Sequence, residues 1–507
     1  MTSKMTDYGV AVPLRSGQSV RYLGSAAQHP RLDASLQLAA VAGLAVLIGA
    51  LVAGSSIATI AIGGTLIGAL VLSQLGLTTF AVACLAVMPI IAGFGSGGVN
   101  GDAGVVADAQ SPLALRVVMN GSLALGFVVL LLAVVPRGRV RLLSVAVGLI
   151  VLSEVVGIDK QQSASLAIES SWLDLRWLGI VGWGVWFATR TELNVRQRIV
   201  WVLLMGWNTL NIGVSLIQIV KGGEGSTRLG LPLVNGVFGH PTFGSVAATM
   251  LLCLVLADPL SPTPFLTRRQ RVLAWVVTAV ALGISLRFKP ILGIVPVVAF
   301  LLLSNRVQLG RLAFAVIVTP LLVTSFALAN VTLPSSGVTR DVLSHAPTRV
   351  LLLQGAQRLA AQNFPFGAGV GTFGARLSDA AETPVFNRAQ IGSVYGFTQE
   401  FPFFRGDNLV AHVLGERGYI GFVLWVAALT LLVMAVSRLS PTHWFPATAV
   451  IAAVGMTPVL PSFLTPSDEF LLFVPAFLLL DLGRVKFLRP WPRYDPMERG
   501  REIGQKA

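Results

Sequence analysis

Long apolar runs separated by short basic loops constrain this chain more than any other feature. An α-helix needs about 20 apolar residues to cross the hydrocarbon layer of a bilayer. With 54% hydrophobic and 12% charged residues, the composition is also far from that of soluble domains. We therefore predict an all-α polytopic membrane protein with about 14 transmembrane helices, at 35–54, 56–75, 77–95, 115–135, 142–157, 177–190, 199–220, 243–257, 272–288, 289–304, 312–329, 417–436, 446–460 and 469–483.

The basic residues of the short loops indicate the orientation. If the N-terminal tail, residues 1–34, is cytoplasmic, every basic cluster falls on the cytoplasmic side, as the positive-inside tendency requires. These clusters are Arg137, Arg139 and Arg141, then Arg190, Arg196 and Arg198, then Arg268, Arg269 and Arg271, then Arg306 and Arg311, then Arg438, and finally the tail 484–507. Topology thus accounts for the net charge of +14, and we expect membrane lipids but no nucleic acid as partners.

One long polar segment, residues 330–416, is placed on the outer face by the same count. It separates a bundle of about 11 helices at 35–329 from about three helices at 417–483. From Asn330 to Arg417 the chain has seven arginines and no lysine, namely Arg340, Arg349, Arg358, Arg376, Arg388, Arg405 and Arg417. A guanidinium binds phosphate or carboxylate in a bidentate way, which favours an anionic ligand, although a preference for arginine codons would explain the same bias.

A glycine-rich run, PFGAGVGTFG at 365–374, lies inside the long segment. It has neither the dinucleotide nor the Walker pattern, so we expect its glycines to allow a tight turn and close backbone approach. Before it, residues 341–362 are predicted to form a helix along the membrane surface. The apolar stripe of this helix consists of Leu352, Ala356, Leu359 and Ala360, with Arg349 at its edge.

The long segment ends at a helix that leads into the membrane. Asn408, His412 and Glu416 are spaced i, i+4 and i+8, so they share one face of that helix. Asp407 stands at the expected helix start, where a carboxylate is either an N-cap or a catalytic group. The only two cysteines, Cys84 and Cys253, lie in apolar runs, so no disulfide framework or metal site is expected from them.

Three more polar residues are predicted on the outer face. Arg228 and His240 belong to the loop at 221–242, where a histidine beside a proline is either a cap residue or a catalyst. Arg287 lies between two predicted spans. Its charge either reaches the lipid headgroups or lines a water-filled cavity, and charges within membranes are functional by default.

These residues, in this order, resemble the O-antigen ligase and polymerase family. The resemblance covers roughly residues 199–436 and rests on Arg228, His240-Pro241, Ser285-Leu286-Arg287, Arg349, the run at 365–371, Asp407-Asn408, Glu416, Gly418 and Gly421. It implies a GT-C-like, inverting, metal-independent glycosyltransferase without a cofactor. Such an enzyme takes a glycan from a polyprenyl-diphosphate-linked oligosaccharide on the outer face of the bacterial inner membrane and passes it to a glycan or lipid acceptor.

The resemblance also implies roles for single residues. Arg228, Arg287 and Arg349 would hold the donor diphosphate, in accord with the need of a leaving diphosphate for fixed positive charge. Arg405 is expected to be a further ligand of the donor diphosphate, and Arg358 is another candidate site residue. Asn408 and Glu416, introduced above, belong to the same set of candidates.

The catalytic base is left open. The ligases of the family usually have His-Asn where this chain has Asp407-Asn408, and burial can make a carboxylate serve as the base. His412 and His240 are the alternatives to Asp407. The absence of the histidine favours a chain-extending polymerase, or a transferase with another acceptor, over a ligase.

A lipid-linked oligosaccharide flippase, or another polytopic transporter, is the competing hypothesis. An even number of spans and arginines in a central cavity would suit a carrier equally well. Transporters usually show two halves of similar hydropathy and bind substrate near the bilayer midplane. This chain shows no convincing repeat, and its polar candidates are predicted at the outer surface.

Overall fold

The computed structural model describes residues 89, 123–124, 126–128, 130, 141–158, 164–221, 227–228, 231–232, 234–238, 241–285, 289–303, 348–374, 384–394, 397–398, 405–406, 408–457 and 466–481. The chain divides into two compact units, 1–80 and 81–507, and every described residue belongs to the second. The predicted tails at 1–34 and 484–507, the first two predicted spans and the span at 312–329 lie outside the described residues.

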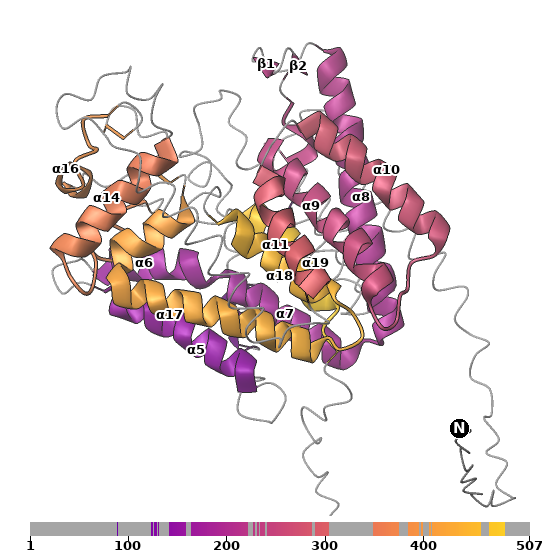
Figure 1. Ribbon diagram of the computed structural model, residues 1–507, viewed down its shortest axis with the longest axis horizontal. Helices are drawn as coiled ribbons and strands as arrows, with labels where there is room; N and C mark the ends of the chain where they lie inside the picture. Colours follow the sequence, from indigo (N-terminus) through magenta and orange to yellow (C-terminus); the bar gives the residue numbers. More distant parts are fainter. Residues whose placement is uncertain are drawn as a thin grey trace, which may run out of the picture. The chain divides into compact units, whose positions relative to one another are not determined.

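The described part is helical over 80% of its residues, in agreement with the predicted all-α class. Its α-helices are α5 (Arg141–Val156), α6 (Ala164–Leu175), α7 (Trp177–Arg190), α8 (Leu193–Val220), α9 (Pro241–Ala257), α10 (Arg268–Ser285), α11 (Lys289–Leu303), α14 (Thr348–Gln362), α16 (Val385–Arg388), α17 (Leu409–Leu439), α18 (Phe445–Met456) and α19 (Pro466–Leu478) (Figure 1). Two 3-10 turns, η2 (Gly236–Phe238) and η3 (Asp258–Leu260), and an antiparallel pair of strands, β1 (Thr227–Arg228) and β2 (Leu231–Pro232), complete it. Most of these helices coincide with predicted spans.

Three segments of the described part are long and apolar enough to cross a membrane. They are Leu193–Val220, Thr242–Leu260 and Leu409–Leu439, and shorter apolar stretches lie at Leu292–Leu303 and Phe445–Met456. These helices support a membrane protein. The number of crossings, predicted as about 14, stays a prediction.

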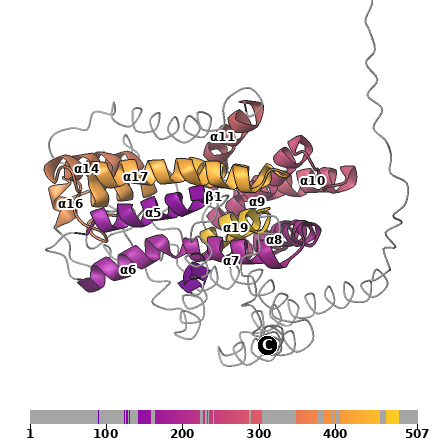
Figure 2. The same ribbon diagram turned by 90° about the horizontal axis from the view of Figure 1, so that it is seen from below.

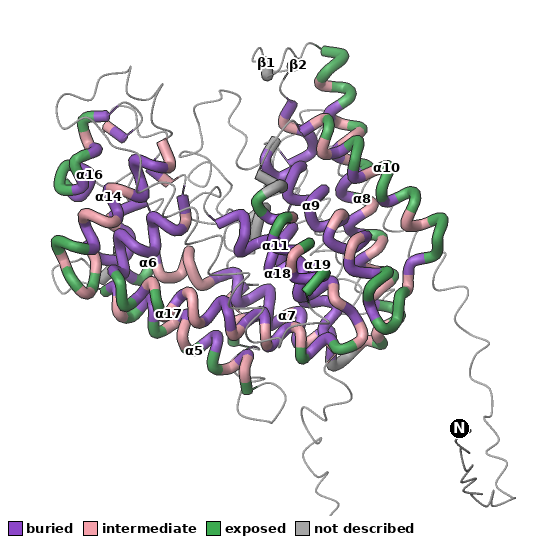
Figure 3. Tube along the Cα trace, in the orientation of Figure 1, coloured by how far each residue is buried: buried purple, intermediate pink, exposed green. Residues whose placement is uncertain are grey.

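The side chains of α10 also agree with a membrane protein. Its inward residues are Ala274, Thr278, Ala281 and Ser285, spaced by three or four positions, as expected for one helical face. The opposite side exposes large apolar side chains, namely Val272, Leu273, Trp275, Val276 and Val280. Figure 3 shows exposed residues recurring along α10. A contiguous apolar face that is turned outward is typical of a surface that contacts lipid or another protein.

Helix α17 organises the part of the fold that holds the polar candidates. It packs along α5 on one side and α14 on another (Figure 2). Its first residue follows Asn408, whose side-chain oxygen accepts a hydrogen bond from the Ala411 N–H over 3.0 Å. Asn408 is therefore the N-cap. Asp407, the residue before it that was predicted to stand at the helix start, lies outside the described residues.

A glycine interrupts α17 nine residues after its start. Gly418 has φ 64° and ψ −165°, a conformation that favours glycine because it has no Cβ. A Cβ at Gly418 would also lie 2.4 Å from the backbone nitrogen of Gly367. The glycine-rich run thus approaches α17 closely at this break, and four of its glycines have positive φ: Gly367, Gly369, Gly371 and Gly374. The predicted tight turn and close approach are confirmed.

Helix α14 differs from its prediction as a one-sided surface helix. It begins at Thr348, and the predicted residues before it lie outside the described part. The predicted stripe is buried, but Val350, Leu351 and Leu353 are buried as well. The reason is that α14 is covered twice: α17 packs on it, and Ile391 approaches it near Gly355.

Beyond the opposite end of α17, α8 is joined to the end of α19, and the N–H of Asp481 donates to the carbonyl oxygen of Leu439 over 2.7 Å. Arg196 of α8 donates hydrogen bonds to the carbonyl oxygens of Leu478, over 3.0 Å, and of Leu480. Beside it, Gln197 Nε2 lies 2.5 Å from Nε2 of His443. These hydrogen bonds of Arg196 all go to backbone carbonyl oxygens of the protein.

Candidate functional site

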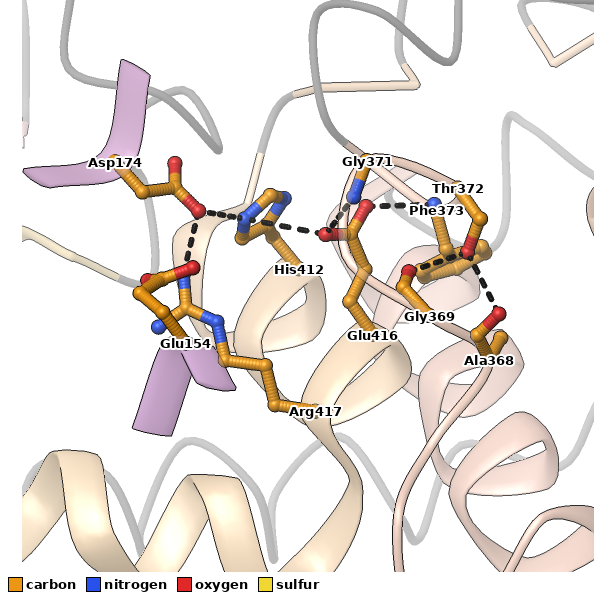
Figure 4. Close-up of polar contacts among 10 residues, drawn as sticks. All are labelled: Glu154, Asp174, Ala368, Gly369, Gly371, Thr372, Phe373, His412, Glu416 and Arg417. Carbon is orange, nitrogen blue, oxygen red and sulfur yellow. Dashed lines mark hydrogen bonds and ion pairs between the residues drawn. The ribbon is translucent and has the colours of Figure 1, made fainter. Parts of the chain in front are cut away.

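A buried acid–base pair lies where α6 meets the start of α17. Asp174, near the end of α6, and His412, in the first turn of α17, come within 2.9 Å between Oδ2 and Nε2 (Figure 4). The side chains are 6% and 0% exposed, respectively. An ionised carboxylate only accepts hydrogen bonds, so Nε2 of His412 carries the proton and donates to Asp174. In the neutral ring, the lone pair is then on Nδ1.

The protonation state of Asp174 follows from its neighbours. Burial by itself would raise the pKa of this carboxyl, but the charge of the His412 ring when it is protonated, together with the charge of Arg417, outweighs burial. The pKa of Asp174 therefore lies below its ordinary value. The carboxylate is ionised at neutral pH and can stabilise an imidazolium at His412.

Arg417 connects this pair to α5. Its Nη2 atom donates a hydrogen bond to Oδ2 of Asp174 and also lies 2.5 Å from Oε1 of Glu154. The side chains of Arg417 and Glu154 are each 3% exposed. Removing charges from water is costly, so a buried ion pair of this kind depends on every partner being present.

Glu416 fixes the glycine-rich run onto α17. Its two carboxylate oxygens accept hydrogen bonds from the backbone N–H groups of Gly371, over 2.6 Å, and Phe373, over 2.7 Å (Figure 4). Oε2 of the same carboxylate is 3.7 Å from Nε2 of His412. The predicted spacing of His412 and Glu416 on one helical face is confirmed, and the second residue joins the run to the acid–base pair.

Some hydrogen-bonding capacity in this cluster is unused within the described part of the chain. His412 Nδ1, Arg417 Nε and Glu154 Oε2 are buried there without a hydrogen-bond partner. Buried polar atoms are paired in the great majority of cases, so such groups call for a functional explanation. His412, Asp174, Glu154, Glu416 and Arg417 are called the buried charge cluster below.

Arg349 lies beside the start of α17, the helix that carries His412. It lies in the first turn of α14, and its carbonyl oxygen accepts a hydrogen bond of 3.4 Å from the side chain of Asn408. The start of α14 therefore lies against the start of α17, one turn before His412. The side chain of Arg349 is half-buried.

Two other predicted arginines hold the loop between α16 and α17. Arg405 donates from Nε to the carbonyl oxygen of Phe397, and its guanidinium lies 4.6 Å from the ring centre of Phe386. Arg358 donates to the carbonyl oxygen of Ala389 over 3.1 Å. Their contacts here are with the protein itself, and their binding of a diphosphate stays a prediction.

The remaining predicted residues are only partly described. Asp407, His240 and Arg287 lie outside the described residues. Arg228 is described by its backbone alone, as the residue of β1 that pairs with Leu231. The structure consequently brings together His412, Glu416 and Asn408 from the predicted set, with Arg349 nearby.

Three members of the cluster were missed in the sequence. Glu154 had a signal, since it is an acidic residue inside the apolar run predicted as a span at 142–157. Arg417 was counted among the arginines of the long segment but was given no role. Asp174 stands in a polar stretch of ordinary composition, where nothing marks it.

Comparisons with known proteins add nothing to this geometry: no family model, no curated protein and no solved structure matches the chain. Among the described residues, no group of three His, Cys, Asp or Glu side chains could hold a metal ion. Fold and cluster together define a helical protein with candidate membrane spans and a buried set of acidic and basic side chains at the start of one of them.

Proposed function

We propose that this protein is a membrane glycosyltransferase of the O-antigen ligase and polymerase type, GT-C-like, with about 14 transmembrane helices. It takes a glycan from a polyprenyl-diphosphate carrier on the outer face of the bacterial inner membrane, with both termini in the cytoplasm. The observation that carries the proposal is the pairing of His412 with Asp174. A neutral histidine with one nitrogen bound to a carboxylate, and with no hydrogen-bond partner at the other among the described residues, has the arrangement that general-base catalysis uses.

In the proposed reaction, an acceptor hydroxyl attacks the anomeric carbon of the lipid-linked sugar with inversion. The new bond joins the acceptor oxygen to this carbon, while the bond from the carbon to the diphosphate oxygen breaks. The polyprenyl diphosphate leaves with the bonding electrons, and the hydroxyl proton passes to Nδ1 of His412. The resulting imidazolium is stabilised by Asp174 at 2.9 Å and by Glu416 at 3.7 Å.

The donor diphosphate needs fixed positive charge as it leaves. Arg349 supports this role because its helix starts beside the first turn of α17, which carries His412. Arg287 and Arg228 complete the proposed arginine set, and independence from metal ions is part of the proposal. Asp407 and His240 stay as rival bases, with His412 favoured by its carboxylate partner.

A flippase for the same lipid-linked donor is the second candidate. One observation favours it: the buried charge cluster involves three carboxylates, from α5, α6 and α17. Buried acidic groups beside histidine and arginine are typical of the proton relays in membrane transporters. A flippase would move the intact donor and form no glycosidic bond.

The test uses purified protein in liposomes with a defined polyprenyl-diphosphate oligosaccharide and EDTA, and products are resolved by mass. The parent is expected to release polyprenyl diphosphate and to build a longer glycan or a new conjugate. His412→Gln should slow this by about 10²–10⁴-fold, the usual contribution of a general base. Asp407→Asn serves as the comparison for the rival base.

The matched control is His443→Gln. His443 is also buried, but it follows the far end of α17, whereas His412 lies in the first turn of that helix. This variant should keep the parental rate. Transport of the intact donor across the liposome membrane, without any new glycosidic bond, would replace the transferase with the flippase.

A further inference from the structure

Three exposed aromatic side chains surround the break in α17. Phe364 and Phe366 flank the start of the glycine-rich run and are 72% and 52% exposed, and Tyr419, directly after the break, is 39% exposed. The ring centres of Phe364 and Tyr419 are 6.0 Å apart. We call these three residues the aromatic patch. None of them belongs to the buried charge cluster.

The backbone holds the patch firmly at the break. The N–H of Ile420 donates to the carbonyl oxygen of Pro365 over 3.4 Å, and the N–H of Gly369 donates to the carbonyl oxygen of Glu416 over 3.0 Å. The close approach of Gly367 to Gly418 adds to these contacts. The two phenylalanines therefore keep a defined position relative to the second part of α17.

The patch is continuous with an exposed apolar face of that second part. Val423, 64% exposed, lies one turn after Tyr419 on the same side of the helix, and Ile420, 40% exposed, borders that side. Between Arg417 and Arg438 the sequence has no charged residue. A helix over these residues is about 30 Å long, which matches the hydrocarbon thickness of a bilayer. The uncharged part of α17 thus begins at the break at Gly418.

We propose that the aromatic patch is a membrane anchor, in which Phe364, Phe366 and Tyr419 insert among phospholipids at the boundary between headgroups and acyl chains. Tyrosine and other aromatic rings favour this boundary, where the apolar ring leaves water and a hydroxyl stays hydrated. The anchor sets the depth of the break in the bilayer. His412 belongs to the part of α17 before the break, so the anchor also fixes the position of this residue relative to the apolar layer. This inference does not depend on the proposed enzymatic activity.

The test measures depth in the membrane with spin labels on the full-length protein in phosphatidylethanolamine and phosphatidylglycerol liposomes. The background carries Cys84→Ser and Cys253→Ala, and single cysteines are introduced by Phe366→Cys or, independently, Tyr419→Cys. Arg388→Cys, at an exposed residue of α16, is the reference for water, and Val423→Cys is the reference for lipid. Collision with oxygen reports lipid, and collision with a water-soluble nickel chelate reports water.

Labels at Phe366 and Tyr419 are expected to lie about 5–10 Å below the phosphate level, between the two references. Nickel access as high as at Arg388 would overturn the anchor, because the patch would then be in water. Protection from both reagents would overturn it as well, because a protein surface, from this chain or a second copy, would then cover the patch. If the labels at Phe366 and Tyr419 report the same depth, that depth is not a local effect of either substitution.

Discussion

Nε2 of His412 lies 2.9 Å from Oδ2 of Asp174, although the two residues are 238 positions apart in the chain. The contact joins a helix that leads into a candidate membrane span to a short helix that precedes α7. It fixes one ring nitrogen of the histidine, while the other, Nδ1, has no hydrogen-bond partner in the described part of the chain. The predictions below test this pair, the ion pairs around it and the backbone that holds them.

The first prediction concerns Asp174→Asn. The amide keeps the shape of the side chain but removes the charge that stabilises an imidazolium, so kcat should fall about 10²–10⁴-fold with little change in KM for the donor. The measurement is steady-state glycosyl transfer. Glu169→Gln, an exposed carboxylate on the same helix, is the control and should leave both constants unchanged. A parental kcat in Asp174→Asn would remove this residue from the mechanism.

The second prediction concerns the buried ion pairs. Arg417→Gln leaves Glu154 and Asp174 without their shared cation, which should lower the free energy of unfolding by about 3–5 kcal/mol. Adding Glu154→Gln should restore part of the loss, because one unpaired charge is then gone. Denaturation in detergent, with the exposed Arg269→Gln as reference, provides the comparison. If the double variant is no more stable than Arg417→Gln, the pairing with Glu154 does not exist.

The third prediction concerns the break in α17. Gly418→Ala places a Cβ against the backbone of the glycine-rich run at a positive φ, so it should cost about 1–3 kcal/mol. Gly206→Ala is the matched control, since a Cβ at this helical glycine of α8 meets nothing within 4 Å. The control should be neutral or more stable by up to about 1 kcal/mol. Equal thermal midpoints for the two variants would contradict the close approach at Gly418.

The fourth prediction concerns pH. Burial, helped by the charge of Arg196, lowers the pKa of His443 to about 4. The unfolded chain, with a histidine pKa of about 6.5, binds more protons below that pH than the folded protein does. Stability from this residue is therefore complete above pH 6.5 and declines towards pH 4, by up to about 1.4 kcal/mol per pH unit. Unfolding midpoints from pH 7 to 4.5 should fall more steeply in the parent than in His443→Gln, and parallel slopes would refute the assignment.

Much of the described fold could be predicted from local patterns in the sequence. The apolar runs predicted helices at the positions of α5, α7, α8, α9, α11, α17 and α18, because helix formation and burial depend on nearby residues and their hydrophobicity. The i, i+4 spacing was sufficient to place His412 and Glu416 on one face. The glycines of the run 365–374 predicted a tight turn, because positive φ is a property of single residues.

The candidate site depended on contacts between distant parts of the chain. Asp174 has no local mark, and only the packing of α6 against α17 brings it to His412. Asn408 is the N-cap because its side chain accepts a hydrogen bond from the Ala411 N–H. The sequence could not decide between Asn408 and Asp407, because asparagine and aspartate are both preferred at this position.

What the sequence by itself determined is a helical chain with apolar segments, an arginine-rich stretch and a histidine and a glutamate one turn apart. What only the tertiary structure decided is which charges meet. Residue types and spacing act over a few positions along the chain, whereas the pairing of Glu154 and Asp174 with Arg417 arises when three helices exclude water from the same place.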